Sequence, residues 1–432
     1  MGHLRPRADL EKGIAVVERV VITGIGAVTS LGVGSGPLVQ RWISGESGIE
    51  DSCSRCLDFE PLSVLGRKEV RRSDRFTHLA IGAAEEALTQ AGWSAADLPY
   101  EDERIACIVG TGVGGMATLE AQVSNVESRG YKGVSPMTVP MMMSNSAAGY
   151  IALRYGLRGP SFSVGSACAT GGHALGTAAR MIQSGEADAV VTGASEAAVT
   201  ALGLGCFHAM EALSRTGRSL PFDARRDGFV MGEGAGALVL ESAAGAEARG
   251  AHVLAEILGY GTTTDAYHIT APDPEARGAV RAIEIALRDA GLMPGDIDYI
   301  NAHGTATELN DRSETIAIKR VFGERAARVP VSSTKSVIGH LLGASGLVEA
   351  VATIGALQCG VIPPTVGYAE QEPGMDLDYV PESRPLPVMD RPAVALSNAF
   401  GFGGHNVVVC LGIPRRQVTA EDDRMPSLQG AA

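Results

Sequence analysis

The sequence has few aromatic residues, fewer basic than acidic residues, and no long apolar run. Aromatic residues make up 5% of the 432 residues, whereas 55 residues are glycine and 45% are hydrophobic, which favours tightly packed α/β layers with many turns. The net charge of −13 disfavours nucleic acid as the main partner, because phosphate binding requires clustered Lys and Arg. Since no stretch of about 18 charge-free apolar residues occurs, we expect no membrane span.

The chain has seven cysteines, an odd number that argues against a framework of disulfides. Its first residues are polar and charged and lack the apolar stretch of a secretory signal. We therefore expect a cytoplasmic, reducing location, with a flexible extension at residues 1–19 and a flexible tail at residues 413–432.

Short strands rich in β-branched residues alternate with helical patterns along most of the chain. The helical patterns cover residues 74–91, 280–290, 311–322 and 341–358, and a further helix follows residue 168. The expected strands are 20–23, 104–110, 162–166, 189–193, 236–241, 253–259, 299–302, 330–333, 394–397 and 407–410. This alternation predicts an α/β protein with a mostly parallel sheet and helices on its faces.

A five-residue echo suggests that the chain contains two similar halves. Gly-His-Ala-Leu-Gly at residues 172–176 and Gly-His-Leu-Leu-Gly at 339–343 each follow a strand by a few residues and open a helix. We therefore expect an N-terminal half at residues 20–260 and a C-terminal half at residues 261–412.

Cys168 is the first candidate for a reactive side chain. It lies among small residues after an expected strand, just before a helix that is apolar on at least one face. The N-terminus of a helix favours negative charge, so we expect this placement to lower the pKa of Cys168 and to favour a thiolate nucleophile. The alternative is a buried structural cysteine, which is the usual role of a free thiol.

Two histidines in similar settings favour the catalytic alternative. His303 follows a strand in a Gly/Thr turn, and His340 follows another strand through a loop that contains Lys335. Side chains at the carboxyl ends of strands in open α/β sheets point into the ligand-binding crevice. Glu349 lies on the following helix and is available to Lys335. Other histidines, such as His173, lack such a setting and are interpreted as structural or surface residues.

Two glycine-rich loops have different interpretations. The loop at residues 398–406 follows a strand, and its N–H groups can point at an oxyanion while Phe400 and Phe402 line an apolar pocket. The segment at residues 110–115 satisfies the dinucleotide-binding pattern, but no strand with a terminal acid clearly follows about 20 residues later. A dinucleotide-dependent oxidoreductase is therefore the less favoured alternative.

Four motifs occur in a distinctive order. They are Ser-Ala-Cys-Ala-Thr-Gly at 166–171, Asn-Ala-His-Gly-Thr at 301–305, Thr-Lys-Ser at 334–336 with Gly-His at 339–340, and Phe-Gly-Phe-Gly-Gly at 400–404. Together they resemble the β-ketoacyl-acyl-carrier-protein synthases, most closely the elongating synthase II branch, from about Val20 to Leu411. The resemblance implies a thiolase-like α/β fold, in which two duplicated βαβαβαββ halves stack as five α/β layers, and usually a dimer.

The resemblance also implies the catalytic roles. Cys168 is the implied acylated nucleophile, and its N–H and that of Phe400 form the implied oxyanion hole. His303 and His340 hold the malonyl thioester carbonyl and promote loss of carbon dioxide. The implied reaction is a decarboxylative Claisen condensation of malonyl-acyl-carrier protein with an acyl chain held on Cys168.

Further residues match supporting positions of the family. Lys335 orders the site through Glu349, and Val113 falls where a larger Ile often limits pocket depth, which implies a roomy pocket. The implied substrate-binding residues are Thr305, Thr307, Phe229, Phe400, Phe402 and Val113. No metal or redox cofactor is needed, because the substrates are carried on the phosphopantetheine of the carrier protein.

The implied partners are an acyl carrier protein and a second subunit, either an identical copy or a chain-length-factor-like chain. This acidic chain contains one basic run, which is either a solvated surface or a docking surface for an acidic carrier protein. Complementary charge on the two proteins would speed their association. The run consists of Arg67, Lys68, Arg71, Arg72 and Arg75. Glu211 stands where fatty-acid enzymes often have an Arg that binds the carrier, which puts ordinary carrier docking there in doubt.

The sequence combines features of two branches of the family. Residues 309–314 and 205–207 resemble ketosynthase subunits of type II polyketide systems, whereas the Phe400-Gly401 pair resembles fatty-acid elongation enzymes. We interpret the chain as an elongating synthase of a type II polyketide or polyene system or of fatty-acid synthesis. The alternatives are a housekeeping homodimeric synthase II and a non-catalytic partner subunit, although the inactive members of the family lack the cysteine that this chain keeps as Cys168.

Overall fold

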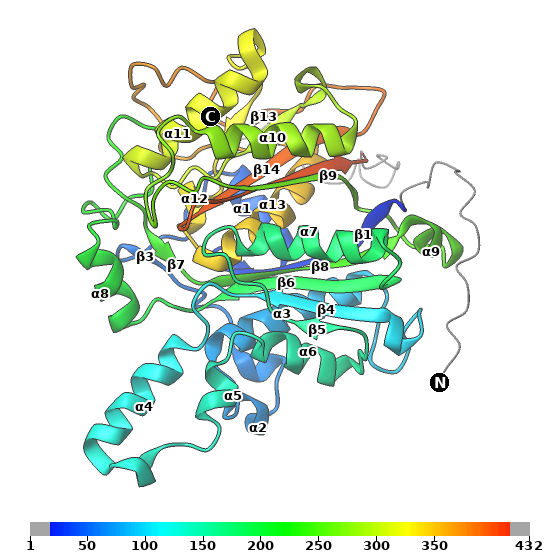
Figure 1. Cartoon of the computed structure of the whole chain (residues 1–432), viewed down its shortest axis with the longest axis vertical. Coiled ribbons are helices and arrows are strands. Elements are labelled where there is room, and N and C mark those ends of the chain that lie inside the picture. Colours follow the sequence, from blue (N-terminus) through cyan, green and yellow to red (C-terminus); the bar gives the residue numbers. More distant parts are fainter. Residues whose placement is uncertain (1–17, 415–432) are drawn as a thin grey trace, which may run out of the picture.

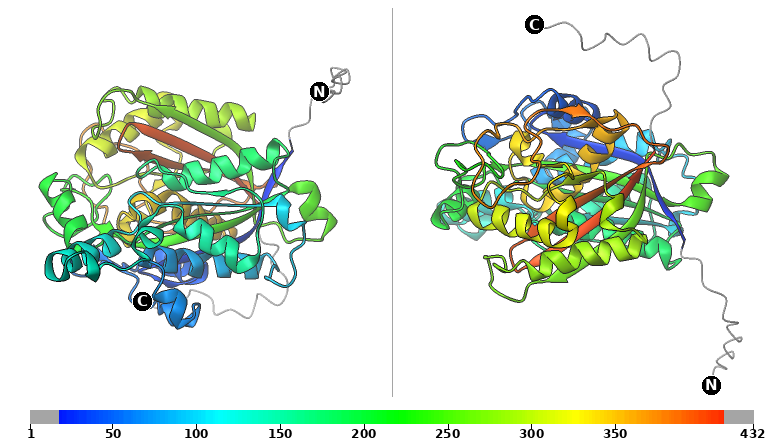
Figure 2. Two further views of the ribbon diagram at one scale, coloured as in Figure 1. Left: turned by 60° about the horizontal axis from the view of Figure 1, so that its bottom comes forward. Right: turned by 90° about the horizontal axis from the view of Figure 1, so that it is seen from above.

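The structure is a computed structural model that describes residues 18–414. The expected end segments, residues 1–19 and 413–432, lie almost entirely outside the described residues. Strands and helices alternate along the described chain (Figure 1). The further views in Figure 2 show strands in the interior with helices on either side of them. No helix between residues 18 and 414 is both long and apolar enough to cross a membrane.

The first half of the chain forms five neighbouring strands of one large sheet. Their spatial order is β5 (Ser161–Phe162), β4 (Ile105–Gly110), β6 (Ala189–Glu196), β8 (Gly234–Ser242) and β1 (Val20–Thr29). β4 pairs in parallel with β5 and β6, whereas β8 pairs antiparallel with both β6 and β1.

The second half repeats this pattern strand for strand. Its order is β11 (Val331–Ser332), β10 (Tyr299–Asn301), β14 (Ala393–Gly401), β15 (His405–Ile413) and β9 (Ala255–Thr264). β10 pairs in parallel with its two neighbours, and β15 pairs antiparallel with β14 and β9. The two halves join where β1 pairs antiparallel with β9.

The sheet is therefore mixed, and the expectation of a mostly parallel sheet is wrong for the last two pairings of each half. A short hairpin can join antiparallel strands, whereas parallel strands need a longer crossover connection. β14 and β15 are joined by only three residues and form a hairpin.

Helices divide the molecule into five layers, as the thiolase-like fold predicts (Figure 1). α3 (Arg75–Gln90) and α6 (Ser146–Tyr155) cover the outer face of the first half. α10 (Arg277–Ala290) covers the outer face of the second half, with α11 (Glu308–Phe322) beside it. α7 (Thr170–Gln183) and α13 (Ser345–Gln358) form the central layer between the strands of the two halves.

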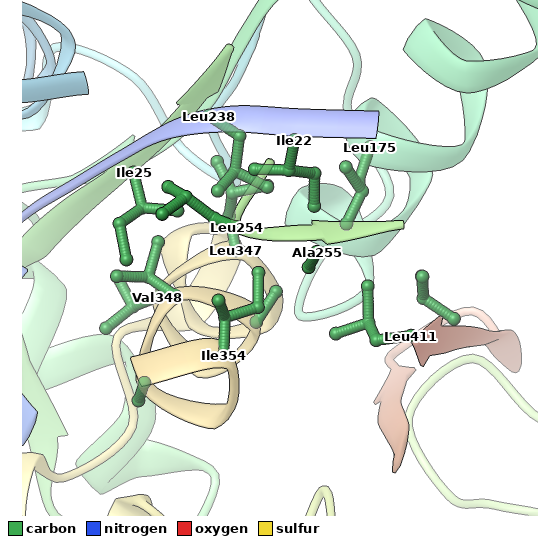
Figure 3. Close-up of a cluster of buried hydrophobic side chains, with 14 of the residues drawn as sticks. Ile22, Ile25, Leu175, Leu238, Leu254, Ala255, Leu347, Val348, Ile354 and Leu411 are labelled. Carbon is green, nitrogen blue, oxygen red and sulfur yellow. The ribbon is translucent and has the colours of Figure 1, made fainter. Parts of the chain in front are cut away.

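The central layer contains the largest apolar core. Figure 3 shows Ile22 and Leu238 from the first half meeting Leu347 of α13, with Leu175 of α7 and Leu411 of β15 close by. These side chains are all buried. Burial of each such side chain stabilises the fold by about 1.5–3 kcal/mol.

α7 and α13 cross with their backbones in contact near their first turns. A Cβ atom on Gly171 would lie 2.5 Å from the backbone nitrogen of Leu347, and one on Gly346 would lie 3.0 Å from that of Gly172. Glycine at both positions therefore lets the two helix N-termini meet. This contact also brings together the two segments that precede the helices, one segment from each half of the chain.

The duplication is confirmed by the sheet order, but the five-residue echo does not mark equivalent positions. Gly172–Gly176 lies inside α7, whereas His340 precedes α13 by five residues. The expected helix at 341–358 begins only at Ser345, after a short 3₁₀ turn at Leu342–Ala344, and the expected strand at 162–166 is reduced to β5. Residue 260 lies within β9, so we now place the proposed division between the halves just before Ala255.

Smaller elements complete the described chain. The remaining helices are α1 (Ser35–Ile43), α2 (Arg67–Val70), α4 (Met116–Arg129), α5 (Thr138–Met142), α8 (Ala201–Ala209), α9 (Ala243–Ala248) and α12 (Lys335–Ile338). The remaining strands are β2 (Gly32–Val33), β3 (Cys53–Ser54), β7 (Met231–Gly232), β12 (Val361–Ile362) and β13 (Arg384–Pro385).

Candidate active site

Cys168 lies in a tight loop between β5 and α7, two residues before the helix begins, as the sequence predicts. Ala167 has a left-handed φ of 49°, which a non-glycine residue adopts only where its surroundings hold it there. The Ser166 N–H donates a hydrogen bond to Thr170 Oγ1 (2.8 Å), and Ser166 Oγ lies 2.7 Å from His173 Nδ1. His173, interpreted from the sequence as structural, thus supports the loop that presents the cysteine.

His340 reaches the same point from the second half of the chain. Its Nε2 lies 3.0 Å from Cys168 Sγ, and its Nδ1 lies 2.8 Å from Ser345 Oγ. Its backbone N–H donates a hydrogen bond of 2.7 Å to the carbonyl of Val230. Because a hydroxyl can donate or accept, His340 can use Nε2 either to accept the thiol proton or to donate to an oxyanion.

His303 stands beside His340 at the end of β10, with ring centroids 5.5 Å apart. Lys335 Nζ lies 3.4 Å from His303 Nδ1 and forms a fully buried ion pair with Glu349, the partner expected from the sequence. An ammonium group can only donate, so it favours the tautomer with the proton on Nε2. His303 is therefore a hydrogen-bond donor towards the cavity.

Burial determines the protonation states of these groups. Burial raises the pKa of Cys168 to about 12, although the Lys335 ammonium and the Phe402 N–H act in the opposite direction. Burial and the Lys335 charge lower the pKa of His303 and of His340 well below the usual value. The expectation that the helix N-terminus lowers the pKa of Cys168 is therefore wrong, because the loss of solvation on burial raises this pKa by more. His340 Nε2, 3.0 Å from the sulfur, is the group placed to accept the Cys168 proton.

The glycine-rich loop after β14 lies against the nucleophile. A Cβ atom on Gly401 would lie 3.0 Å from the backbone nitrogen of Cys168 and 2.9 Å from the carbonyl of Ser166, so glycine is needed there. The N–H of Phe402 faces the sulfur of Cys168. The oxyanion hole formed by the N–H groups of Cys168 and Phe400 stays a prediction, and the N–H that the structure places at the sulfur is that of Phe402.

A cavity of about 680 Å³ ends at Cys168, His303 and His340. The substrate-binding residues expected from the sequence all line it: Thr305, Thr307, Phe229, Phe400, Phe402 and Val113. Glu211 and Arg215, which are exposed, line its outer part. Glu211 has a left-handed φ of 53° at the end of the α8 segment.

Aromatic rings wall the two histidines. Phe229 stands edge-on to His340 at 5.2 Å between ring centroids, and Phe400 lies 5.9 Å from His303. Phe207 packs edge-on against Phe229 at 5.4 Å. These apolar walls exclude water, and electrostatic interactions inside the cavity are stronger for that reason.

Glu314 of α11 is a supporting residue that the sequence interpretation missed. Its carboxylate accepts hydrogen bonds from the N–H groups of His303 and Gly304 (both 2.8 Å) and from Asn398 Nδ2 (3.0 Å). Burial raises its pKa to about 7. It thus connects the His303 turn to β14. In the sequence, two acidic residues, Asp311 and Glu314, lie about one helical turn apart just after the histidine motif. The structure buries both of them.

The glycine-rich segment at residues 110–115 binds a carboxylate of the protein itself. Glu196, at the end of β6, accepts hydrogen bonds from the N–H groups of Gly112 (2.8 Å), Val113 (3.2 Å) and Gly343 (3.1 Å), and from Thr111 Oγ1 (3.0 Å). These donors are the ones that a dinucleotide phosphate would need. Because these N–H groups already bind Glu196, they are not free to bind a phosphate, which argues against the oxidoreductase alternative.

The basic run divides into two parts. Arg67, Lys68, Arg71 and Arg72 are exposed on α2 and the residues after it, and their docking role stays a prediction. Arg75 instead forms a bidentate, partly buried ion pair with Glu233, at 2.6 and 2.8 Å, and donates to a backbone carbonyl. Arg75 therefore has a structural role, and we remove it from the docking surface.

Comparisons with known proteins agree with this site. Residues 57–246 match the family model described as beta-ketoacyl synthase, N-terminal domain, and residues 254–369 match the C-terminal domain. The 3-oxoacyl-[acyl-carrier-protein] synthase 2 of Synechocystis sp. is 45% identical over 93% of this chain and 98% of its own. The enzyme of the same name from Staphylococcus aureus (strain N315) is 43% identical over 91% of this chain and 97% of its own.

Solved structures are similar over nearly the whole chain. The ishigamide ketosynthase/chain length factor has a TM-score of 0.85 at 33% identity, covering 92% of this chain and 100% of that one. A type II PKS acyl-carrier protein in complex with its ketosynthase has a TM-score of 0.83 at 30% identity, with the same coverage. A ketosynthase in complex with its chain length factor from Xenorhabdus doucetiae has a TM-score of 0.79 at 27% identity, covering 92% and 98%.

Proposed function

The chain belongs to the β-ketoacyl synthase family and is an acyltransferase-type condensing enzyme, and from this premise we propose that it elongates acyl chains carried on an acyl carrier protein. The observation that supports the proposal best is the approach of Cys168 Sγ to His340 Nε2, 3.0 Å apart, beside His303. All three side chains lie at the inner end of a cavity that admits a substrate.

In the first step, Cys168 takes the acyl group. His340 Nε2 accepts the thiol proton, and the sulfur attacks the carbonyl carbon of the incoming acyl thioester. The N–H groups of Cys168 and Phe400 stabilise the oxyanion of the tetrahedral intermediate, and each such donor lowers the barrier by about 2.7–4 kcal/mol. The intermediate collapses to the acyl-cysteine, and the proton passes from His340 to the departing carrier thiol.

In the second step, the malonyl group loses carbon dioxide. His303 donates from Nε2 to the malonyl thioester oxygen, and His340 donates to the same oxygen once its proton lies on Nε2. The electron pair of the broken carbon–carbon bond then forms an enolate, whose negative charge the two imidazole N–H groups stabilise. The low local polarity of the phenylalanine walls strengthens both hydrogen bonds.

In the third step, the enolate carbon attacks the acyl-cysteine carbonyl. The carbon–sulfur bond breaks, and Cys168 leaves as a thiolate that takes up one proton from solvent, which His340 Nε2 is placed to pass on. The product is a 3-oxoacyl chain, two carbons longer, on the carrier protein.

Intact-protein mass after incubation with acyl carrier proteins bearing short to long acyl groups tests this proposal. We expect one added acyl mass that maps to Cys168 and is absent in the Cys168→Ser variant. The Cys206→Ser variant is the matched control, because Cys206 is exposed on α8. An acyl mass that persists in Cys168→Ser and maps to a position other than 168 would show that another residue is the nucleophile.

The second subunit is proposed to be another copy of this chain. α4 and α5 project from the body as an arm (lower left in Figure 1), and several of its apolar side chains are exposed. They are Leu119, Val123, Val126, Val139 and Met143. The neighbouring β5 is an edge strand that pairs only with β4. A two-fold axis would bring this self-complementary surface of two copies together.

The molar mass of the purified chain in solution tests this subunit arrangement. We expect a dimer, converted to a monomer by Val123→Glu in the middle of the arm. Val388→Glu is the control, because Val388 is equally apolar and 87% exposed on the second half. If the wild-type chain were a monomer and paired only with a chain-length-factor-like chain, the proposed homodimer would be contradicted.

The pathway has two candidates. Similar structures include type II polyketide ketosynthases, and the unusual Glu211 lies at the cavity, which favours a specialised polyketide or polyene system. The 45% identity to a synthase 2 enzyme favours fatty-acid elongation. Loading rates as a function of acyl length and unsaturation separate them: a preference for saturated medium and long chains supports the fatty-acid pathway, and a preference for polyketone or polyene chains supports the other.

A further inference from the structure

One group of metal-ligating side chains in residues 18–414 is close enough to share an ion, and it is Cys168, His303 and His340. Their ligand atoms all lie within 4.8 Å of one another, and all three side chains are buried. A tetrahedral zinc site, with Zn–S of about 2.3 Å and Zn–N of about 2.0–2.1 Å, needs ligand atoms about 3–4 Å apart. We propose that Zn²⁺ binds to these three side chains and blocks Cys168, which gives the enzyme a reversible, metal-inhibited state.

The ligand atoms lie near one another, and two of them are held from behind. His340 Nε2 lies 3.0 Å from Cys168 Sγ, while its Nδ1 is held by Ser345 Oγ at 2.8 Å. Metal-binding histidines are usually oriented in this way by a partner on the other ring nitrogen. His303 has Lys335 at its Nδ1, so its Nε2 is the atom left for the shared centre.

The chemistry of the three ligands suits zinc. One thiolate and two neutral imidazoles form a borderline-soft set, and the fourth position faces the cavity, where water can occupy it. Binding breaks the S–H bond of Cys168, forms an S–Zn bond and releases one proton to solvent, and no electron is transferred.

Lys335 opposes the metal and limits its affinity. Its ammonium group lies 3.4 Å from His303 Nδ1, repels a divalent cation and keeps the proton on Nε2, where the metal must bind. Zinc binding therefore requires the His303 proton to move to Nδ1. Replacing the ammonium with an uncharged side chain removes both costs, so we expect Lys335→Met to bind the metal more tightly than the wild type.

Titration of the tag-free, full-length chain with Co²⁺ tests the site, because tetrahedral Co²⁺ absorbs visibly and thiolate ligation adds a charge-transfer band. We expect one equivalent of Co²⁺ to give both signals and Zn²⁺ to displace it. Cys168→Ser should lose the charge-transfer band, while the exposed-cysteine control Cys206→Ser should keep it. A spectrum unchanged in Cys168→Ser, or one typical of octahedral Co²⁺ alone, would overturn the proposal.

A second measurement uses the wild-type chain only and so does not depend on the folding of a variant. We expect Zn²⁺ to protect Cys168 from alkylation by iodoacetamide, mapped by peptide mass, and to leave Cys206 reactive. Equal alkylation of Cys168 with and without Zn²⁺ would also overturn the proposal. Because both tests omit acyl substrates, they can succeed or fail independently of the proposed condensation, which is measured by acyl loading in metal-free buffer.

Discussion

At the scale of single residues, the site is defined by the hydrogen-bond partner that each buried polar group finds. Cys168, His303 and His340 were identifiable from the sequence, because their motifs name them. Ser345, Glu314 and the tautomer of His303 were not, because their roles depend on which backbone N–H or ring nitrogen lies opposite them. The same burial explains why the thiolate expectation for Cys168 was wrong.

Glu314 should make stability depend on pH. Its pKa is raised from 4.5 to about 7, so the folded chain binds this proton more tightly than the unfolded chain. Its contribution to the free energy of unfolding is fully present below about pH 4.5 and is lost as the pH rises through about 7, by on the order of 3 kcal/mol. We expect the Tm of Glu314→Gln to change less than that of the wild type between about pH 5 and pH 8.

Glu324 supplies the control for this measurement, because it is an exposed acid on the turn that follows the same helix. Glu324→Gln should keep the pH dependence of the wild-type Tm. If Glu314→Gln also kept it, the carboxyl of Glu314 would have an ordinary pKa in the folded chain.

Gly401 should control the acylation rate. A methyl group there would lie 3.0 Å from the backbone nitrogen of Cys168, so Gly401→Ala displaces the nucleophile loop or its oxyanion donors. Misplacement by about 1 Å can cost about 100-fold in rate, and we expect a loss of that order in acyl loading followed by mass. Gly36→Ala, on α1 with no atom within 4 Å of the new methyl group, should load at the wild-type rate. Equal rates in the two variants would contradict this role of Gly401.

At the scale of elements, apolar periodicity located the buried helices and missed the exposed ones. The expected helix at 74–91 matches α3, which buries most of its residues, whereas α4 buries only Thr118 and was not among the expected helices. The strand expected at 162–166 was too long, because the residues after Phe162 form the turn that presents Cys168.

The contact between α7 and α13 should be sensitive to a single methyl group. Gly171→Ala places a Cβ 2.5 Å from the backbone nitrogen of Leu347, so the helices must separate, and overpacking of this kind costs about 1–3 kcal/mol. We expect a lower denaturation midpoint in urea together with slower acyl loading. Gly149→Ala is the control, because its methyl group on α6 meets no atom within 4 Å and alanine favours a helix. A midpoint for Gly171→Ala at or above that of the control would contradict the close crossing.

At the scale of the whole molecule, charge is distributed unevenly. The chain has a net charge of −13, yet Arg67, Lys68, Arg71 and Arg72 are exposed together around α2. If this surface docks an acidic carrier, Arg67→Glu with Lys68→Glu should raise the KM for carrier-bound substrate about tenfold and reduce its salt dependence. The kcat should not change, since neither residue lines the cavity.

Arg328→Glu is the matched control for the docking surface, because Arg328 is an exposed arginine on the second half of the chain. It should leave the KM near the wild-type value. A KM for acyl-pantetheine that rises as much as that for the carrier-bound substrate would contradict docking, since the small substrate has no carrier to dock.

The division of the site between the two halves has a consequence for synthesis on the ribosome. Cys168 emerges early in translation, but His303, His340 and Gly401 are added much later, and β14 near the end. An unfinished or prematurely terminated chain therefore has a cysteine without its proton acceptor. We therefore expect acyl transfer to Cys168 only after both halves of the chain have been made and have folded together.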